Sequence, residues 1–328
     1  MDNQREQPQL WGDKRYHSLN YHLREKFGEK VSKISLDAGF SCPNRDGSLG
    51  WHGCAFCSAR GSGDFVAVPQ ESLAEQFRQG KEIMQKKWPV KKYIAHLQSF
   101  TNTYAPVSSL RKIYYSLLEL PGVAGMAIST RPDCLPEEVL NLLAEINQKT
   151  FLWVELGLQT IHKHSSQYLN LHYDYNDFLL AINALRRRNI AVCAHIILGL
   201  PGEKRKDMLA TAQALSALPV QGIKIHLLHL MKNTPLADIY AQQPFAFLSQ
   251  EEYVDLVVDI LEILPPQMVI HRLTGDSPRD LLIGPTWSLS KKNVLNAIDR
   301  ELKKRNSWQG KCFRNMGERL NATFDRVK

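Results

Sequence analysis

The chain has 328 residues, of which 44% are hydrophobic and 23% are charged, and its formal net charge is +8. This composition is typical of a globular protein and excludes a collagen-like or low-complexity chain. The longest apolar run, near residues 190–200, contains His195 and is too short to cross a bilayer, and the amino terminus is polar, so we expect a cytoplasmic protein with no membrane partner.

Strands and helices are predicted to alternate from residue 31 to residue 264. Short apolar runs predict strands at 31–36, 93–97, 125–129, 151–158, 190–198 and 222–228. Apolar residues at helical spacing predict helices at 110–120, 136–146, 175–187, 204–218 and 253–264. A further helix is expected to begin at Pro69 and to bury Leu73, Phe77, Met84 and Trp88.

Strands that are apolar throughout favour a parallel sheet that helices cover. Six repeats predict an α/β fold, a partial TIM-like (βα)6 barrel whose functional groups gather at the carboxyl ends of the strands. A flat, doubly wound sheet is the alternative, which periodicity does not exclude. We divide the chain into an N-terminal leader (1–30), the partial barrel (31–264) and a helical C-terminal extension with a basic tail (265–328).

The positive charge is concentrated in that tail. Residues 290–328 hold eleven Lys or Arg against four Asp or Glu, which is nearly the whole excess. Such a concentration favours binding of polyanions, above all nucleic acid, although a solvated terminal helix has the same composition. We expect Trp308 and Phe313, which lie in the tail, to be packing residues.

Three cysteines follow the first predicted strand: Cys42, Cys54 and Cys57. Three thiolates can bind three irons of a [4Fe–4S] cluster and leave the fourth iron free for a small molecule, whereas electron-transfer clusters use four cysteines. The alternative is a zinc site in which His52 is the fourth ligand. The remaining cysteines, Cys134, Cys193 and Cys312, are expected to be buried thiols.

This segment resembles a known family. The run Cys-Pro-Asn-Arg-Asp-Gly at 42–47 and Phe56 before the last cysteine resemble the cluster loop of the radical S-adenosylmethionine (SAM) superfamily, in the bacterial branch related to the catalytic subunit of Elongator. Four later segments, 129–133, 154–160, 195–203 and 224–229, resemble the barrel of the same branch, and the similarity extends over residues 10–312.

The resemblance implies a [4Fe–4S] cluster on the three cysteines and bound SAM. The residues it suggests for contacts with SAM are Gln98, Glu155, Gln159 and Gly199. Two of them have a plainer interpretation: Glu155 could form a structural ion pair with Arg131, and the segment from Gly199 to Gly202 could be no more than a turn from a strand to a helix. We expect His226 and His229 to be core histidines with satisfied hydrogen bonds. No residue is identified that quenches the substrate radical.

The resemblance also implies a reaction. Radical SAM enzymes generate a 5′-deoxyadenosyl radical and need a reductant such as flavodoxin or ferredoxin. Segments 271–282 and 308–311 look most like a subgroup that converts carboxymethylaminomethyl-uridine to aminomethyl-uridine at the wobble position of tRNA. No acetyltransferase domain follows the barrel, so carboxymethylation that depends on acetyl-CoA is not expected.

Two other function classes stay open at this stage. A radical SAM enzyme for a small metabolite or a protein would share every barrel motif. A non-catalytic zinc or iron–sulfur protein that binds nucleic acid would need the cysteines but no open iron.

Overall fold

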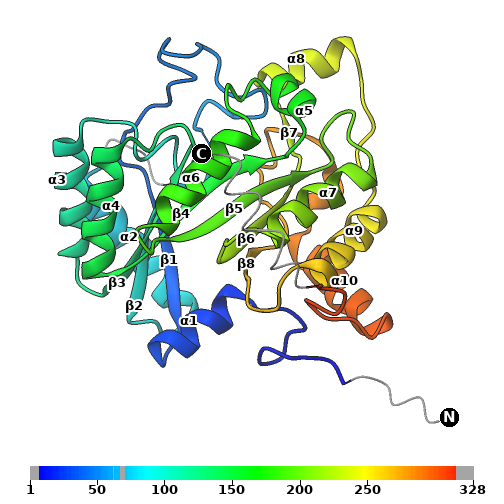
Figure 1. The fold of residues 1–328 in the computed structure, drawn as a ribbon, viewed down its shortest axis with the longest axis horizontal. Coiled ribbons are helices and arrows are strands. Elements are labelled where there is room, and N and C mark those ends of the chain that lie inside the picture. The colour runs from blue at the N-terminus through cyan, green and yellow to red at the C-terminus, as the bar shows by residue number, and fades with distance from the viewer. Residues whose placement is uncertain (1–6, 62, 67–70, 315–328) are drawn as a thin grey trace.

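The computed structural model describes residues 7–61, 63–66 and 71–314, and the statements below concern these residues. They contain a sheet of seven parallel strands, curled into a half-barrel with helices on its outer side (Figure 1). Its strands are β1 (Val31–Leu36), β2 (Lys92–Leu97), β3 (Val123–Thr130), β4 (Phe151–Gln159), β5 (Ala191–Leu198), β6 (Gly222–Leu227) and β8 (Val269–Arg272). The helices are α1 (Leu19–Phe27), α2 (Leu73–Lys87), α3 (Val107–Leu118), α4 (Glu137–Lys149), α5 (Lys163–Tyr168), α6 (Tyr175–Arg186), α7 (Arg205–Ser216), α8 (Pro235–Gln242), α9 (Gln250–Ile263) and α10 (Lys291–Lys304).

The order of the strands in the sheet follows their order in the chain. A doubly wound sheet reverses its strand order at a switch point, so that alternative is excluded and the partial barrel is confirmed. The sheet has one strand more than predicted, because β8 pairs with β6 in parallel. Strand β8 has only four residues and ends in His271 and Arg272, so it gives no clear apolar run.

Strand β8 lies in the range that we had assigned to the C-terminal extension. Within that range, β9 (Leu282–Gly284) also pairs with β7 (Leu230–Met231), and a 3-10 helix spans Thr286–Leu289. The amide of Gln309 donates to the carbonyl oxygens of Pro265 and Met268. The described part of the extension is therefore tied to the barrel, while the three-part division stays a prediction.

The helix expected from Pro69 is shorter than predicted. Pro69 lies outside the described residues, and α2 begins at Leu73, where the hydroxyl of Ser72 accepts a hydrogen bond from the Glu75 amide. Trp88 is not in the core as expected: it follows the helix, is 52% exposed, and has the Lys30 ammonium 3.2 Å from its ring centroid. Three short helices, α1, α5 and α8, were not predicted, because each is too short to show a repeated apolar spacing.

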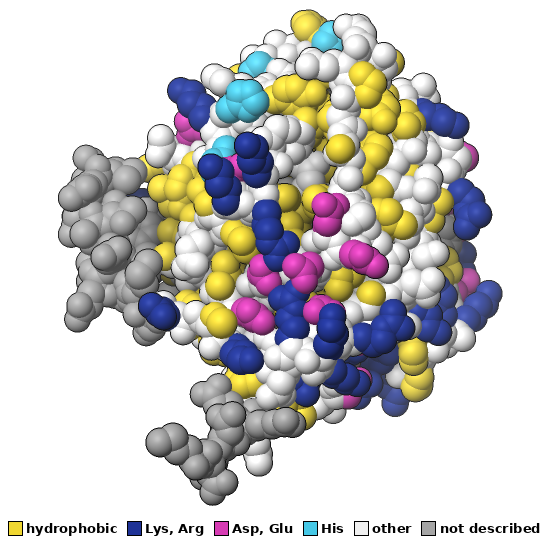
Figure 2. Space-filling view, turned by 90° about the vertical axis from the view of Figure 1, so that its right-hand side faces the viewer, with side chains coloured by type: hydrophobic (Ala, Val, Ile, Leu, Met, Phe, Trp, Pro, Cys, Tyr) yellow, Lys and Arg dark blue, Asp and Glu magenta, His cyan; other side chains and the backbone are white. Residues whose placement is uncertain are grey.

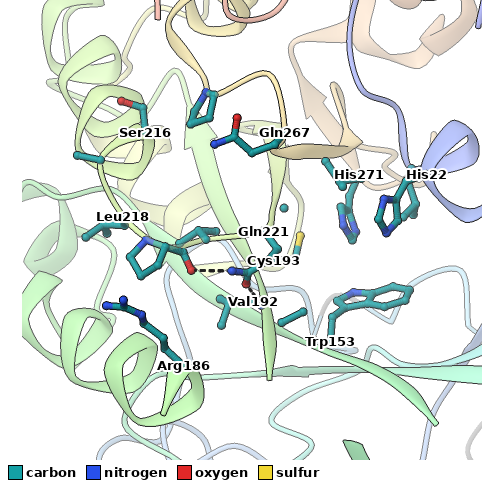
Figure 3. Close-up of a pocket in the computed structure, with 18 of the residues that line it drawn as sticks. His22, Trp153, Arg186, Val192, Cys193, Ser216, Leu218, Gln221, Gln267 and His271 are labelled. Carbon is teal, nitrogen blue, oxygen red and sulfur yellow. Dashed lines mark hydrogen bonds between the residues drawn. The ribbon is translucent and has the colours of Figure 1, made fainter. Parts of the chain in front are cut away.

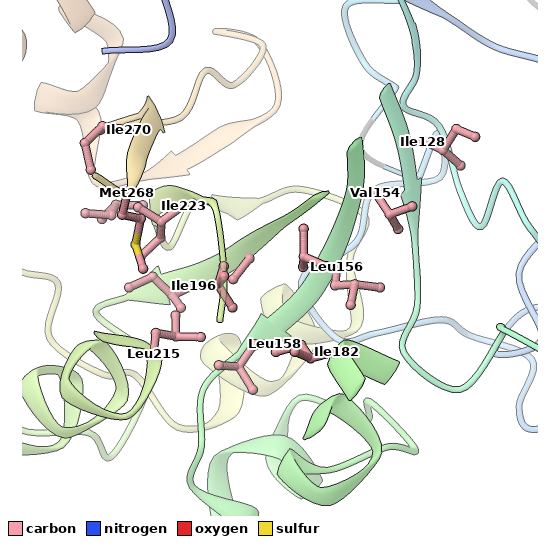
Figure 4. Close-up of a cluster of buried hydrophobic side chains, with 14 of the residues drawn as sticks. Ile128, Val154, Leu156, Leu158, Ile182, Ile196, Leu215, Ile223, Met268 and Ile270 are labelled. Carbon is pink, nitrogen blue, oxygen red and sulfur yellow. The ribbon is translucent and has the colours of Figure 1, made fainter. Parts of the chain in front are cut away.

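The main core lies between the sheet and the surrounding helices. Figure 4 shows how side chains that point outward from the strands meet side chains from the helices, among them Val154, Leu156, Ile182, Ile196 and Leu215. The inward-pointing side chains form a second, smaller cluster at the amino-terminal end of the barrel: Val31, Ile94, Ala127, Trp153 and Cys193, together with Leu23 of α1. This apolar plug closes one end of the interior.

The burial of the core predicts that alanine substitutions of two leucines will differ clearly in their effect on stability. Leu156 on β4 is fully buried, whereas Leu180 on α6 is 52% exposed. We expect Leu156→Ala to lower the free energy of unfolding by about 2–5 kcal/mol, because it removes buried methyl groups and leaves a cavity. The control Leu180→Ala should change it by less than about 0.5 kcal/mol. Denaturant titration measures both, and equal losses would contradict this account of the core.

Candidate functional site

The three clustered cysteines lie on the loop that follows β1, at the carboxyl ends of the strands (Figure 1). All three are free and partly exposed. The carbonyl oxygen of Cys42 accepts hydrogen bonds from the amides of Arg45, at 2.8 Å, and Asp46, at 3.2 Å. The amide of Cys57 donates to the carbonyl oxygen of Cys54 at 2.9 Å. Two tight turns therefore shape the loop at its cysteines.

The three thiols affect one another. A hydrogen bond from Cys57 lowers the pKa of Cys54 to about 7, against the effect of burial, and the nearby positive charge of Arg131 adds to it. The same hydrogen bond and burial raise the pKa of Cys57, and the neighbouring Cys54 and Cys42 raise it further. Three thiols close enough to interact, one of them easily ionised, fit the donor set of an iron–sulfur cluster.

Buried polar side chains hold this loop in place. Asn44 is fully buried and its amide donates to the Asn170 carbonyl oxygen at 2.6 Å and approaches the Cys54 sulfur at 3.6 Å. The Oδ1 atom of Asn44 has no hydrogen-bond partner among the described residues. Arg45 donates to the carbonyl oxygens of Cys57 and Ser58. An unpaired buried oxygen next to a thiol is a position where a bound group can complete the hydrogen bonds.

The zinc alternative finds no support in this geometry. His52 is exposed. Throughout the described ranges, no group of three or more His, Cys, Asp or Glu side chains is placed to hold a single metal ion. Of the other cysteines, Cys134 and Cys193 are buried as predicted, but Cys312 is exposed, contrary to the prediction.

The end of β2 packs directly under the cysteine loop. The Phe100 amide donates to the Gly61 carbonyl oxygen at 3.0 Å, and the Thr101 amide donates to that of Ser41 at 3.2 Å. Phe100 has a positive φ of 60°. Gln98, the residue suggested for the ammonium group of SAM, accepts a hydrogen bond from Ser35 at 2.9 Å. The structure thus places Gln98 beside the loop, and its contact with SAM stays a prediction.

Gln159 has an unusual backbone at the end of β4. Its φ is 66°, a conformation that costs energy in a residue other than glycine and often marks a functional site. The pairing with β5 shifts by one residue here, between Gly157 and Gln159. A Cβ atom on Gly157 would lie 2.5 Å from Nε2 of Gln159. A larger residue at 157 would therefore displace the Gln159 amide from its present position.

Gly199 ends β5 and begins the turn to α7. Its φ is 82°, and that of Gly202 is the same. The turn interpretation is therefore correct at the level of the backbone. A Cβ atom on Gly199 would lie 3.4 Å from Leu248, an ordinary van der Waals contact, so the positive φ favours glycine here rather than any lack of space. The predicted contact with adenine remains untested.

Glu155 is the centre of a polar layer inside the barrel. Its side chain is fully buried, and Lys224 of β6 donates to Oε2. Ser129 donates to the same oxygen at 2.8 Å, and Nε2 of His96 lies 3.0 Å from it. The indole of Trp153 donates to Oε1 at 3.1 Å. The expected pair with Arg131 is wrong: Arg131 binds Asp133 instead.

Two more side chains approach this carboxylate from other strands. Nε2 of His195 lies 3.3 Å from Oε2 of Glu155, and the Lys33 ammonium lies 3.8 Å from Oε1. Burial lowers the pKa of His195 to about 4 and that of Lys33 to about 7, helped in both cases by the positive Lys224. For Glu155, burial raises the pKa, but His96, Lys224 and Lys33 outweigh it and hold the pKa well below its usual range. A contact of Glu155 with ribose would have to replace one of these partners.

Sequence reasoning missed the partners of this carboxylate. The signal was a polar residue at an inward position of each apolar strand, such as Lys33, His96 and Lys224. His226 and His229 were expected to have satisfied hydrogen bonds. Their side chains are half-buried, and Nε2 of each is buried without a partner among the described residues. These rings are therefore available to a molecule bound in the barrel.

The basic tail is partly neutralised. Arg305 pairs with Glu301 and Asp259, and Lys291 pairs with Asp276. Figure 2 shows Lys and Arg side chains interleaved with Asp and Glu on the side of α7, α9 and α10. Three of the eleven basic residues, Arg319, Arg326 and Lys328, lie outside the described residues. The described part of the tail therefore forms a less continuous basic surface than its sequence suggested.

Comparison with known proteins gives consistent results. The profile of the Radical SAM superfamily matches residues 49–215, and that of the Radical SAM C-terminal domain matches residues 220–304. The chain is 54% identical to the protein YtqA of Bacillus subtilis over 93% of this chain and 95% of that protein. It is 22% identical to a tRNA uridine(34) acetyltransferase of Methanocaldococcus jannaschii over 58% of this chain and 34% of that enzyme.

Among solved structures, the fold is similar to that of Elp3 from the archaeon Methanocaldococcus infernus. The TM-score is 0.65 at 15% identity, over 85% of this chain and 64% of that one. At this identity the likeness concerns the fold alone. Among the described residues no helix is both long and apolar enough to span a lipid bilayer.

The polar layer predicts a pH dependence of stability. His195 is neutral in the folded state down to about pH 4, whereas an unfolded histidine takes up a proton near pH 6.5. Stability is therefore lost as the pH falls below 6.5, and His195 should account for about 2 kcal/mol of loss between pH 7 and 5.

His195→Gln should remove this part of the slope of unfolding free energy against pH. The control His164→Gln, at an exposed histidine, should keep the wild-type slope. The interpretation is refuted if His195→Gln and the wild type lose the same free energy between pH 7 and 5.

Proposed function

The chain belongs to the radical SAM superfamily, and from that membership we propose that it modifies the wobble uridine of tRNA with a [4Fe–4S] cluster and SAM. The observation that carries the proposal is the loop of Cys42, Cys54 and Cys57 at the carboxyl ends of the strands, three free cysteines whose thiols interact. These thiols would hold the cluster. When bound, the cluster and SAM supply a 5′-deoxyadenosyl radical that takes a hydrogen atom from the substrate.

The residues around the loop would orient SAM. We assign Gln98, Gln159 and Gly199, which lie at the ends of three strands, to contacts with it. Glu155 lies on the same strand as Gln159 but is already surrounded by donors, so it would reach the ribose only by exchanging one of them. Its principal role is then to balance the buried charge of Lys224 and Lys33, while burial and Lys224 keep the imidazole of His195 neutral.

The interior also protects a radical from water. The apolar plug, which includes Ile94, Trp153 and Cys193, closes the amino-terminal end of the barrel. A dry, closed site prevents side reactions of reactive intermediates. The histidines above the polar layer, His226 and His229, would face the substrate with their unpaired Nε2 atoms.

Transfer RNA is the substrate we favour. One relative is a tRNA uridine(34) acetyltransferase, and it matches 58% of this chain. The net charge of +8 also favours a polyanionic substrate. In detail we propose conversion of carboxymethylaminomethyl-uridine to aminomethyl-uridine. Nitrogen would stabilise the radical left on the carbon beside it, loss of one electron from this radical to the cluster would give an imine, and hydrolysis of the imine would break the carbon–nitrogen bond and release the carboxymethyl group as glyoxylate. Flavodoxin or ferredoxin would supply electrons, and the reducing cytoplasm would keep the thiols free.

The cluster ligands can be tested one by one. Replacing Cys42, Cys54 or Cys57 by alanine should abolish the brown absorbance of the anaerobically reconstituted protein and its formation of 5′-deoxyadenosine with SAM and dithionite. The matched control is Cys312→Ala, which removes an exposed thiol elsewhere. A variant of the first three that keeps four irons and full cleavage of SAM would disprove the ligand assignment.

The substrate needs a separate experiment. In a strain that lacks the gene, mass spectrometry of tRNA nucleosides should show carboxymethylaminomethyl-uridine accumulating and aminomethyl-uridine disappearing. Expression of the wild type should restore the nucleoside profile, and the Cys54→Ala variant should not. An unchanged profile, with normal SAM cleavage by the purified protein, would reject tRNA and favour a small metabolite or a protein as substrate.

A further inference from the structure

A cavity of about 720 Å³ lies at the amino-terminal end of the barrel, on the opposite side from the cysteine loop. It is formed by the first residues of β4, β5, β6 and β8, by α1, and by the carboxyl ends of α6 and α7. Its volume is in the range of pockets that bind small molecules. The plug and the polar layer around Glu155 separate it from the site proposed above.

Aromatic rings line one side of this cavity. Figure 3 shows the rings of His22, Trp153 and His271 together on one side, with Arg186 and Leu218 on the other. The rings of Trp153 and His271 meet edge to face, with centroids 5.4 Å apart. A Cβ atom on Gly222 would lie 2.6 Å from the His271 ring, so glycine at this position makes room for the imidazole.

The lining is also cationic. It contains Lys26 and Arg186, and none of the described residues that line it is Asp or Glu. The Lys26 ammonium lies 4.5 Å from the centroid of the Phe151 ring. Burial lowers the pKa of His22, and the neighbouring His17 and Lys26 lower it further, so His22 adds little positive charge at neutral pH.

One polar atom in this cavity lacks a partner. Nδ1 of His271 is buried and has no hydrogen bond within the described part of the chain. Buried polar groups are nearly always paired with protein, water or ligand. Because this atom has almost no exposed surface, a bound molecule would reach it only after the His271 ring turns toward the cavity.

We infer that this cavity is a second binding site, which takes a small planar aromatic ligand with a negative charge. The ring would stack among His22, Trp153 and His271, with a hydrogen bond to Nδ1 of His271. The carboxylate, sulfonate or phosphate would be attracted by Lys26. The site is independent of the cluster, of SAM and of the substrate.

Fluorescence titration of the full-length protein with anilinonaphthalene sulfonate, a planar aromatic anion, tests the inference. We expect one bound probe per chain. Lys26→Ala should raise the Kd about tenfold, since it removes one charge–charge contact. Ala217→Phe, which fills the cavity from the end of α7, should abolish binding. The matched control Arg24→Ala removes an exposed charge from the same helix outside the cavity and should leave the Kd unchanged.

Competition defines the ligand class. Adenosine monophosphate should displace the probe, and uncharged adenosine should do so about tenfold less well. Unchanged unfolding midpoints must accompany the altered Kd values, so that loss of binding is not loss of folding. Equal binding of the probe by all four proteins, no binding by the wild type, or equal displacement by adenosine would overturn the inference.

Discussion

The structure depends on one buried carboxylate and the cations around it. Glu155 has no exposed surface, and an isolated charge in such a position would be strongly destabilising. Lys224, Lys33, the imidazole of His96 and the hydroxyl of Ser129 supply the compensating interactions. These partners come from four different strands, so the charge is satisfied only when the sheet has curled and every strand is in register. A one-residue shift in the pairing of any of these strands would turn its partner of Glu155 away from the interior.

This layer organises the interior along the barrel axis. Below it lies the apolar plug, which contains Ile94 and Trp153. Above it lie the unpaired rings of His226 and His229, and above those the cysteine loop at the carboxyl ends of the strands. The superfamily chemistry needs a dry interior beneath an iron–sulfur cluster. Here a salt-bridged layer and a hydrophobic plug supply that interior together.

Much of the fold could be predicted from the sequence, because apolar strands of a covered parallel sheet are easily recognised. Six strands and the cysteine loop were correctly placed for this reason. Strand β8 was missed, because four residues ending in His271 and Arg272 look like a loop. Trp88 was wrongly assigned to the core, because helical spacing continues one residue beyond the end of α2.

The site was predicted less completely than the fold. Local motifs identified Cys42, Cys54 and Cys57, since these lie within one loop. The partners of Glu155 lie up to 122 residues before it and 69 after it in the chain, one to a strand, and no local pattern connects them. The predicted pair of Glu155 with Arg131 was wrong for the same reason. That two residues both lie near the carboxyl ends of strands does not show that their side chains point toward each other.

Hydrogen bonds and packing hold the cysteine loop against segments that come much later in the chain and are synthesised after it. The Ala55 amide donates to the Leu169 carbonyl oxygen, and the Leu236 amide donates to that of Ala55. Cys54 and Phe56 pack against the cluster that contains Leu228 and Leu236. The loop thus acquires its final shape only after the second half of the chain has folded against it, and a nascent chain that exposes the three thiols does not yet present them in their finished arrangement. The finished arrangement of the three thiols is in this way coupled to completion of the barrel.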